Sequence, residues 1–261
     1  MSFRFRSVLL ISALLAPAAA AQDLLRVCAD PNNLPFSDDK QQGFENKLAE
    51  LIASKLNDKL EYTWWSERKS FLKNSLDAGR CDVVMGVPAS LDTVAVTRPY
   101  YRSAYVFVSR EDRDLRIRSL HDGQLAHLKI GMPVVGDDYA PPAVVLARRG
   151  ITENIVGYSL FGEYGAASPG ARIIEAVDRG DIDLAIVWGP VAGYFAKTAE
   201  SRLDITPVSP PSFLGVPFSY DMAIAVRKKD TELRQKLDQV LESEFAAVQD
   251  LLSRYGVPQV H

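Results

Sequence analysis

The sequence predicts a bilobal α/β protein with a cleft between its two lobes. One observation is the stretch from Gly79 to Arg110, in which a buried strand is followed by a turn and then a long extended segment. The second is the stretch from Arg179 to Ala192, which repeats the order of helix end, Gly, Asp, apolar run, Gly and Pro. Two similar α/β units joined by extended crossings make a protein of two lobes.

The first residues have the pattern of a secretory signal peptide. Arg4 and Arg6 precede a short apolar run at positions 8–15, and a series of alanines ends at Ala21. We therefore expect residues 1–21 to be removed and the mature chain to be exported. The apolar run is too short to span a membrane, and no later stretch reaches the roughly 20 apolar residues that a span needs. Membrane insertion is not expected.

The two cysteines of the chain, Cys28 and Cys81, lie in or next to predicted buried strands. Export favours a disulfide between them, and a pair of buried free thiols is the alternative. In the chain-entropy model, closing a loop of about 50 residues stabilises the fold by roughly 4 kcal/mol. Cysteines this far apart in the sequence do not indicate a metal or redox site.

Alternating strands and helices fill the first lobe. A nearly continuous apolar run, as at 82–87, is what a strand buried on both faces requires, and apolar positions at a helical period mark a helix that covers the sheet. The order is that of a mainly parallel sheet. The predicted elements are a strand at 24–29, a helix at 44–56, a strand at 60–65, a helix capped by Ser66 and ending at Gly79, and a strand at 82–87.

The second lobe is expected between two extended crossings at 100–110 and 218–226. We expect lobe one to comprise residues 22–102 and 220–261, and lobe two residues 103–219. An apolar stripe at 233–252 predicts a C-terminal helix or helix pair that packs on lobe one. Within lobe two the expected elements are a strand at 128–132, a helix at 143–150, an irregular stretch at 157–170, a helix from Pro169 with Ser168 as its N-cap, a strand at 182–188 and a helix at 191–198.

The chain resembles the family 3 periplasmic solute-binding proteins over essentially its whole mature length. The motifs that carry this resemblance are LRVCADPNNLPF, GRCDVVMGVPA, a PYY crossing and GDIDLAIV, in that order. Within the family the chain is similar to the MxaJ/XoxJ-type proteins, on GFENKLAEL, LEYTWW, TRPYYRSAYVFV and DLAIVWGPVAGYF. The resemblance implies the bilobal periplasmic binding protein fold, with mixed, mainly parallel sheets and two hinge crossings.

The MxaJ/XoxJ resemblance also implies a function. It implies a non-catalytic periplasmic companion of a quinoprotein methanol or alcohol dehydrogenase and its c-type cytochrome, which would assist maturation, assembly or partner contact. The alternative is a solute receptor that delivers a small polar ligand to an ABC transporter. A lyase or dehydratase on the same fold is a third possibility, and it would need a general acid or base in the cleft.

Amino-acid receptors of the family hold the ligand carboxylate with an Arg and a hydroxyl, and its ammonium with an acid. Ser90, Pro88 and Trp188 occupy those positions here, and only Asp30 matches an amine-contacting position. Because a buried carboxylate needs a charge-assisted partner, this pattern disfavours amino-acid recognition. Arg98 or Arg68 would have to take over that contact.

The cleft is expected at the carboxyl ends of strands, where open α/β sheets bind ligands. For Asp30, Asn32 and Asn33 the alternative is hydrogen bonding within an Asx turn. No Ser/His/Asp, Cys/His or paired-carboxylate arrangement and no metal-ligand spacing stands out, so neither a catalytic residue nor a cofactor is predicted. The negative net charge of −3 disfavours a nucleic-acid partner. The candidate cleft residues are Asp30, Asn32, Asn33, Phe36, Trp65, Arg68, Pro88, Ser90, Arg98, Tyr100, Tyr101 and Trp188.

Overall fold

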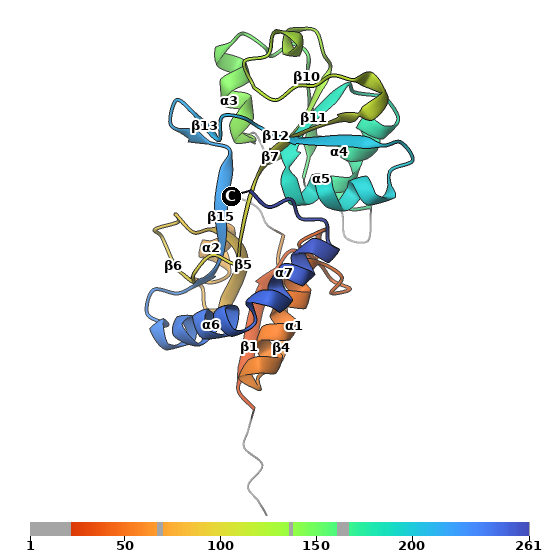
Figure 1. The fold of residues 1–261 in the computed structure, drawn as a ribbon. Coiled ribbons are helices and arrows are strands. Elements are labelled where there is room, and N and C mark those ends of the chain that lie inside the picture. The colour runs from red at the N-terminus through yellow and green to blue at the C-terminus, as the bar shows by residue number, and fades with distance from the viewer. Residues whose placement is uncertain (1–21, 67–69, 136–137, 161–166, 261) are drawn as a thin grey trace, which may run out of the picture.

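A computed structural model describes residues 22–66, 70–135, 138–160 and 167–260. The chain forms two lobes, one above the other in Figure 1, which are joined by two long strands. These strands are β7 (Tyr101–Arg110) and β15 (Ser219–Val226). The predicted signal peptide and the candidate Arg68 lie outside the described residues. The lobe boundaries stay a prediction, but both crossings lie where the sequence placed them.

Lobe one combines the N-terminal α/β unit with the C-terminal helices. Its strands are β1 (Leu24–Ala29), β4 (Lys59–Trp64) and β5 (Val83–Pro88), with the short β2 (Asn32–Asn33), β3 (Ser37–Asp38) and β6 (Ala95–Val96). Its helices are α1 (Phe44–Leu56), α2 (Phe71–Asn74), α6 (Thr231–Ser243) and α7 (Phe245–Arg254).

Lobe two lies between the crossings. Its strands are β8 (Ile130–Val135), β9 (Asp138–Tyr139), β10 (Ile155–Ser159), β11 (Leu184–Trp188), β12 (Leu203–Pro207), β13 (Ser212–Phe213) and β14 (Val216–Pro217). Its helices are α3 (Pro141–Arg148), α4 (Pro169–Asp178) and α5 (Gly189–Phe195), with 3-10 turns at Glu111–Arg113, Gly123–Ala126 and Ala196–Thr198.

One hydrogen-bonded path of strands runs through both lobes, in the order β10-β8-β11-β7-β15-β5-β1-β4. The outer pairs of each lobe are parallel, whereas the pairs that involve β7 and β15 are antiparallel. At the crossing itself, Ser219 lies opposite Ala104 and Met222 lies opposite Tyr101. The predicted bilobal fold with mixed sheets is therefore confirmed.

Each lobe has its own apolar core because its helices cover the sheet with one face. In α1, Phe44, Leu48 and Ile52 are fully buried and follow the predicted helical period. The C-terminal stripe forms α6 and α7, which bury Leu237, Val240, Leu241, Val248, Leu251 and Leu252 in the same core as α1.

Two local predictions were wrong. The N-cap of α2 is Ser70 rather than Ser66, and α2 is a single turn. The stretch predicted to be irregular from Gly157 includes the second half of β10, which pairs with β8.

The predicted start of α4 is confirmed, with Ser168 as its N-cap and Pro169 in its first turn, although the Ser168 side chain makes no capping hydrogen bond. Its Oγ instead donates to the Leu34 carbonyl oxygen of lobe one over 3.3 Å. Before β15, the short strands β13 and β14 form a hairpin for which the sequence analysis made no prediction.

Candidate functional site

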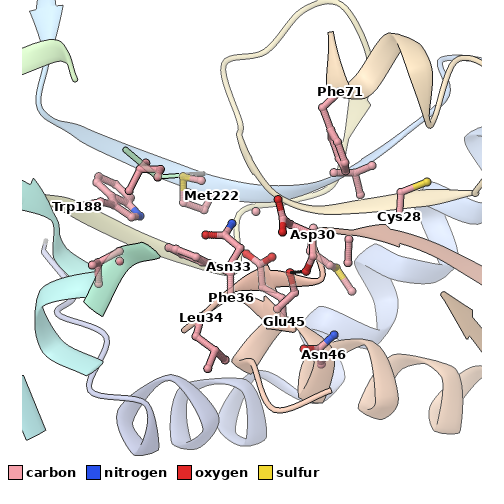
Figure 2. A pocket seen from close by; sticks show the side chains of 18 of the residues that line it. Cys28, Asp30, Asn33, Leu34, Phe36, Glu45, Asn46, Phe71, Trp188 and Met222 are labelled. Atoms are coloured by element: carbon pink, nitrogen blue, oxygen red, sulfur yellow. Dashed lines mark hydrogen bonds between the residues drawn. The ribbon is translucent and has the colours of Figure 1, made fainter. Parts of the chain in front are cut away.

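A cavity of about 400 Å³ lies between the lobes, at the carboxyl ends of β1, β5 and β11. Lobe one contributes the loop after β1, the first turn of α1 and the end of β5. Lobe two contributes Trp188 from β11 and Val191 from α5, and the crossing strands contribute Tyr105, Tyr220 and Met222. Figure 2 shows Trp188 and Met222 on one side, with Asp30, Asn33 and Glu45 facing them. The lining therefore comes from both lobes.

The loop after β1 is held by its own hydrogen bonds. The Asn32 N–H donates to Asp30 Oδ1 over 2.8 Å, and Ser37 Oγ donates to the Asp30 carbonyl oxygen over 2.7 Å. Asp30 thus forms the Asx turn that was the alternative reading, and it lines the cavity as well. Local bonds orient the carboxylate before any ligand arrives.

Glu45 brings a second carboxylate to the cavity from the first turn of α1. Its Oε1 lies against Gly86 and accepts a hydrogen bond of 3.2 Å from the Tyr100 hydroxyl. A Cβ on Gly86 would lie 2.2 Å from this oxygen, and Gly86 has a φ of +66°. A glycine is needed at this position on both counts.

Three aromatic rings form the wall on the side of lobe two. Trp188 lies edge-on to Tyr105 and to Tyr220, with ring centroids 5.4 and 5.8 Å apart. Such edge-to-face pairs hold the rings in fixed orientations. Burial raises the pKa of Tyr105 and of Tyr220, and burial raises the pKa of Tyr62, on the other side of the cavity, to about 12. These phenols are neutral hydrogen-bonding groups at physiological pH.

Five of the predicted cleft residues line the cavity: Asp30, Asn33, Phe36, Pro88 and Trp188. Asn32 and Ser90 do not. Asn32 pairs with Asp38 in the β2-β3 ribbon, and Ser90 is exposed in the turn beyond β5. Ser90, which was expected at the position of the receptor Arg, therefore does not line the cavity, whereas Pro88 and Trp188 form part of its surface.

Four other candidates lie elsewhere. Arg98 is exposed and pairs with Glu242 of α6 over 2.9 Å, which places it on the outer side of lobe one. Tyr100 and Tyr101 are buried in the core of lobe one, and the Tyr100 hydroxyl donates to the lining residue Glu45. Trp65 is exposed and does not line the cavity; the guanidinium carbon of Arg80 lies over its ring, 4.4 Å from the ring centroid. The Arg98 side chain therefore pairs with α6 and does not line the cavity.

The sequence prediction missed Glu45, Tyr62, Tyr105 and Tyr220 as lining residues. Tyr105 and Tyr220 lie in the crossings, where alternation gives every second side chain to one face of the sheet. The alternation in these strands could therefore have predicted that both tyrosines face the cavity. Glu45 depends on how α1 packs beside β5, which no local pattern encodes.

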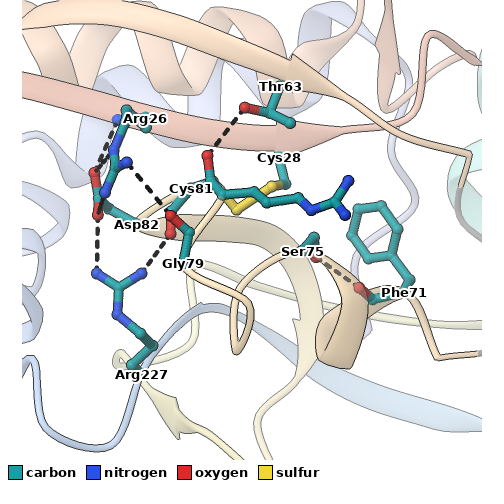
Figure 3. Close-up of a disulfide and its surroundings, with 10 residues drawn as sticks. Arg26, Cys28, Thr63, Phe71, Ser75, Gly79, Cys81, Asp82 and Arg227 are labelled. Carbon is teal, nitrogen blue, oxygen red and sulfur yellow. Dashed lines mark hydrogen bonds and ion pairs between the residues drawn. A yellow bond between two sulfur atoms is a disulfide. The ribbon is translucent and has the colours of Figure 1, made fainter.

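The disulfide between Cys28 and Cys81 supports the cavity from behind. Its Cα atoms are 5.5 Å apart and its sulfurs 2.12 Å apart, and Figure 3 shows it between β1 and the start of β5. The predicted pairing is confirmed. Cys28 itself lines the cavity, so the bond fixes the two strands whose ends carry Asp30 and Pro88.

The described residues hold no cluster of three or more His, Cys, Asp or Glu arranged to bind a metal ion. Within the same residues, every helix is too short or too polar to cross a bilayer.

The two lobes, paired crossings and interlobe cavity define a bilobal binding protein. The chain belongs to the bacterial extracellular solute-binding proteins, family 3, whose pattern matches residues 25–256. The predicted resemblance to this family is thereby confirmed.

Two relatives match nearly the whole chain. Protein MoxJ of Methylorubrum extorquens is 31% identical over 250 residues, covering 90% of this chain and 81% of the relative. Protein MoxJ of Paracoccus denitrificans is 29% identical, covering 94% of this chain and 92% of the relative. These matches bear out the more specific MxaJ/XoxJ-type resemblance.

Solved structures agree with these relatives. The periplasmic binding protein XoxJ of Methylobacterium extorquens AM1 is 32% identical with a TM-score of 0.74, covering 91% of this chain and 99% of that one. MxaJ of Methlophaga aminisulfidivorans MPT is 27% identical with a TM-score of 0.79, covering 90% of this chain and 100% of that one. An ancestral cationic amino acid solute-binding protein, 22% identical with a TM-score of 0.68 and covering 89% of this chain and 95% of that one, shares the fold.

Proposed function

We propose that this protein is a periplasmic, non-catalytic companion of a quinoprotein methanol or alcohol dehydrogenase, and that it assists maturation or assembly of that enzyme. Its likeness to MoxJ and XoxJ along nine-tenths of the chain supports the partner. The family description, extracellular solute-binding proteins, supports an extracytoplasmic location, as does the expected signal peptide.

The observation that carries a binding role is the composition of the cavity. Most of its lining is apolar or aromatic, and Trp188 and Pro88 stand where amino-acid receptors of the family have an acid and a hydroxyl. A surface of this kind gains affinity by removing apolar groups from water. Burying one aliphatic or aromatic side chain contributes about 1.5–3 kcal/mol. We therefore propose that the occupant is an apolar segment of the dehydrogenase.

The polar groups of the cavity would orient such a segment. Figure 2 shows Asp30, Asn33 and Glu45 facing Trp188, whose ring packs edge-on against Tyr105 and Tyr220. An extended segment between them would place apolar side chains on the rings and peptide N–H groups toward the carboxylates. Asp30 and Glu45 are then acceptors and not acid–base catalysts, so no chemical step is assigned to them.

The direct test is co-purification of residues 22–261 with a quinoprotein methanol or alcohol dehydrogenase of the same organism, compared among three forms of the protein. Trp188→Ala removes the central ring of the wall, and we expect binding to weaken by tenfold or more, as for a central aromatic contact. Trp65→Ala is the matched control, because Trp65 is exposed away from the cavity. Equal binding by all three forms would refute use of the cleft, and absence of a complex with the unmodified protein would refute the partner.

The second candidate is a solute receptor for an ABC transporter. Asp30 lines the cavity at the position of an amine contact, and the cavity volume of about 400 Å³ suits a small molecule. Calorimetry with the common amino acids and small amines separates the two functions. Micromolar or tighter binding of such a solute, without a dehydrogenase complex, would favour the receptor. A gene for a permease next to this one would point the same way.

A further inference from the structure

The C-terminal segment forms a third connection between the lobes. Helix α7 ends at Arg254 in lobe one, and Gly256, with a φ of +71°, turns the chain toward lobe two. A left-handed residue after a helix is the usual means of redirecting the chain. Residues 255–260 then lie along β7 and beside α5, as the C-terminal end in Figure 1 shows.

Two hydrogen bonds attach this segment to the crossing strand. Ser103 Oγ donates to the Pro258 carbonyl oxygen over 2.6 Å, and the Val260 N–H donates to the Arg102 carbonyl oxygen over 3.2 Å. Ser103 is fully buried. Arg102 and Ser103 also pair with β15 through Asp221 and Tyr220. The segment therefore covers the point at which both crossing strands would have to bend.

The same segment touches α5 of lobe two so closely that side chains are excluded. A Cβ on Gly193 of α5 would lie 1.8 Å from the Gly256 carbonyl oxygen. A Cβ on Gly256 would lie 2.6 Å from the Gly193 carbonyl oxygen. Contacts under 3 Å cannot form without a shift of the backbone, so this approach requires glycine on both sides.

Side chains extend the contact on either side of the glycine pair. The rings of Tyr194 and Tyr255 stack with their centroids 5.8 Å apart and their planes 13° apart, and Lys197 Nζ donates to the Arg254 carbonyl oxygen. Tyr255 also packs edge-on against Phe44, with centroids 5.9 Å apart. Movement of lobe two about the crossings would break these contacts together.

From this geometry we infer that residues 255–260 act as a strap, which holds α5 against α7 and keeps the cleft at one opening. Bilobal binding proteins ordinarily close around a ligand by bending their crossing strands. Here the strap resists that motion, and the cavity binds as a preformed site. The inference rests on the bilobal fold alone and does not depend on the proposed partner.

The test compares three proteins in solution without ligand: residues 22–261, a deletion of residues 258–261, and Ser103→Ala. The deletion removes the acceptor on Pro258 and the donor on Val260 but keeps the buried Val257. We expect both variants to show a larger radius of gyration in X-ray scattering. We also expect amide hydrogen exchange at 101–104 and 219–222 to be at least tenfold faster in both.

A steric variant with a matched control completes the test. Gly193→Ala forces the strap away from α5, whereas Gly123→Ala adds the same methyl group where no atom lies within 4 Å. We expect only the first to resemble the deletion. If Gly193→Ala does not fold, the deletion and Ser103→Ala still decide. If the deletion variant shows the same scattering and the same hydrogen exchange as the unmodified protein, the strap is refuted.

Discussion

At the scale of single residues, an ion-pair network beneath the disulfide determines how the fold responds to acid. Asp82 accepts two hydrogen bonds from the Arg26 guanidinium, of 2.9 and 2.7 Å, one of 3.4 Å from the Arg26 backbone N–H, and one of 2.8 Å from the Arg227 guanidinium (Figure 3). Burial by itself would raise the pKa of Asp82, but the hydrogen bonds from the two arginines outweigh it and hold the pKa below its ordinary value.

The stability that Asp82 contributes is therefore present above the unfolded-state pKa, near 3.9, and is lost as the pH falls through the folded-state pKa. We predict that Asp82→Asn lowers the free energy of unfolding at pH 7 by about 2 kcal/mol, because the hydrogen bonds to a charged acceptor are lost. Urea unfolding from pH 7 down to pH 3 measures this, and the difference between the two proteins should shrink at the acid end.

Asp92→Asn serves as the control, since Asp92 is an exposed carboxylate in the same lobe. It should leave both the stability and its pH dependence unchanged within about 0.5 kcal/mol. A difference between Asp82→Asn and the unmodified protein that stays constant down to pH 3 would contradict the assignment.

A second residue-scale prediction concerns Gly86, where the cavity and the backbone meet. Gly86→Ala places a methyl group 2.2 Å from Glu45 Oε1 and strains a left-handed residue. We predict a loss of about 1–2 kcal/mol of stability and weaker occupation of the cleft, because Glu45 must turn away from Tyr100. Gly79→Ala is the control. Gly79 has a similar φ of +72° but no atom within 4 Å, so it should lose stability and retain cleft binding.

At the scale of elements, the sequence predicted the helices and strands whose own residues carry a clear hydrophobic pattern. The boundaries of β1 and α1 were predicted to the residue, because an apolar run and a helical period end at clear turn signals. Helix α2 is one turn, held by the burial of Phe71 and not by helix propensity. Strand β10 was not predicted, because its sequence mixes apolar and polar residues. It forms through its pairing with β8 at the edge of the sheet.

The candidate site shows the same division. Asp30, Pro88 and Trp188 follow or end apolar runs, so the rule that ligands bind at strand ends located them. Glu45 joins them only because α1 lies beside Gly86. Arg98 pairs with Glu242 of α6 and does not line the cavity, and this contact between distant parts of the chain is not encoded in the local pattern.

The disulfide is an element-scale constraint, since it ties β1 to β5 across a sequence separation of 53. We predict that replacing both Cys28 and Cys81 by Ser lowers the free energy of unfolding by about 4 kcal/mol, chiefly through the entropy of the unfolded chain. Urea unfolding with and without a reducing agent measures this. The reductant should destabilise the unmodified protein and leave the double variant unchanged. Equal stability of the two oxidised proteins would contradict the prediction.

At the scale of the whole molecule, the question is whether the two lobes unfold as one unit. Each has its own core, and domains joined only by linkers commonly unfold separately. Here β7 and β15 pair with each other and with the sheets of both lobes, so that the hydrogen-bonded path never breaks. The C-terminal strap adds a third tie.

We therefore predict a single calorimetric transition for residues 22–261, with calorimetric and van't Hoff enthalpies that agree. The variant without Cys28 and Cys81 sharpens the test because the disulfide lies wholly in lobe one. If the lobes are coupled, the entire transition should move to lower temperature without splitting. If they are independent, the transition should divide and only one component should shift. That outcome would show that paired crossing strands do not suffice to join two α/β lobes into one cooperative unit.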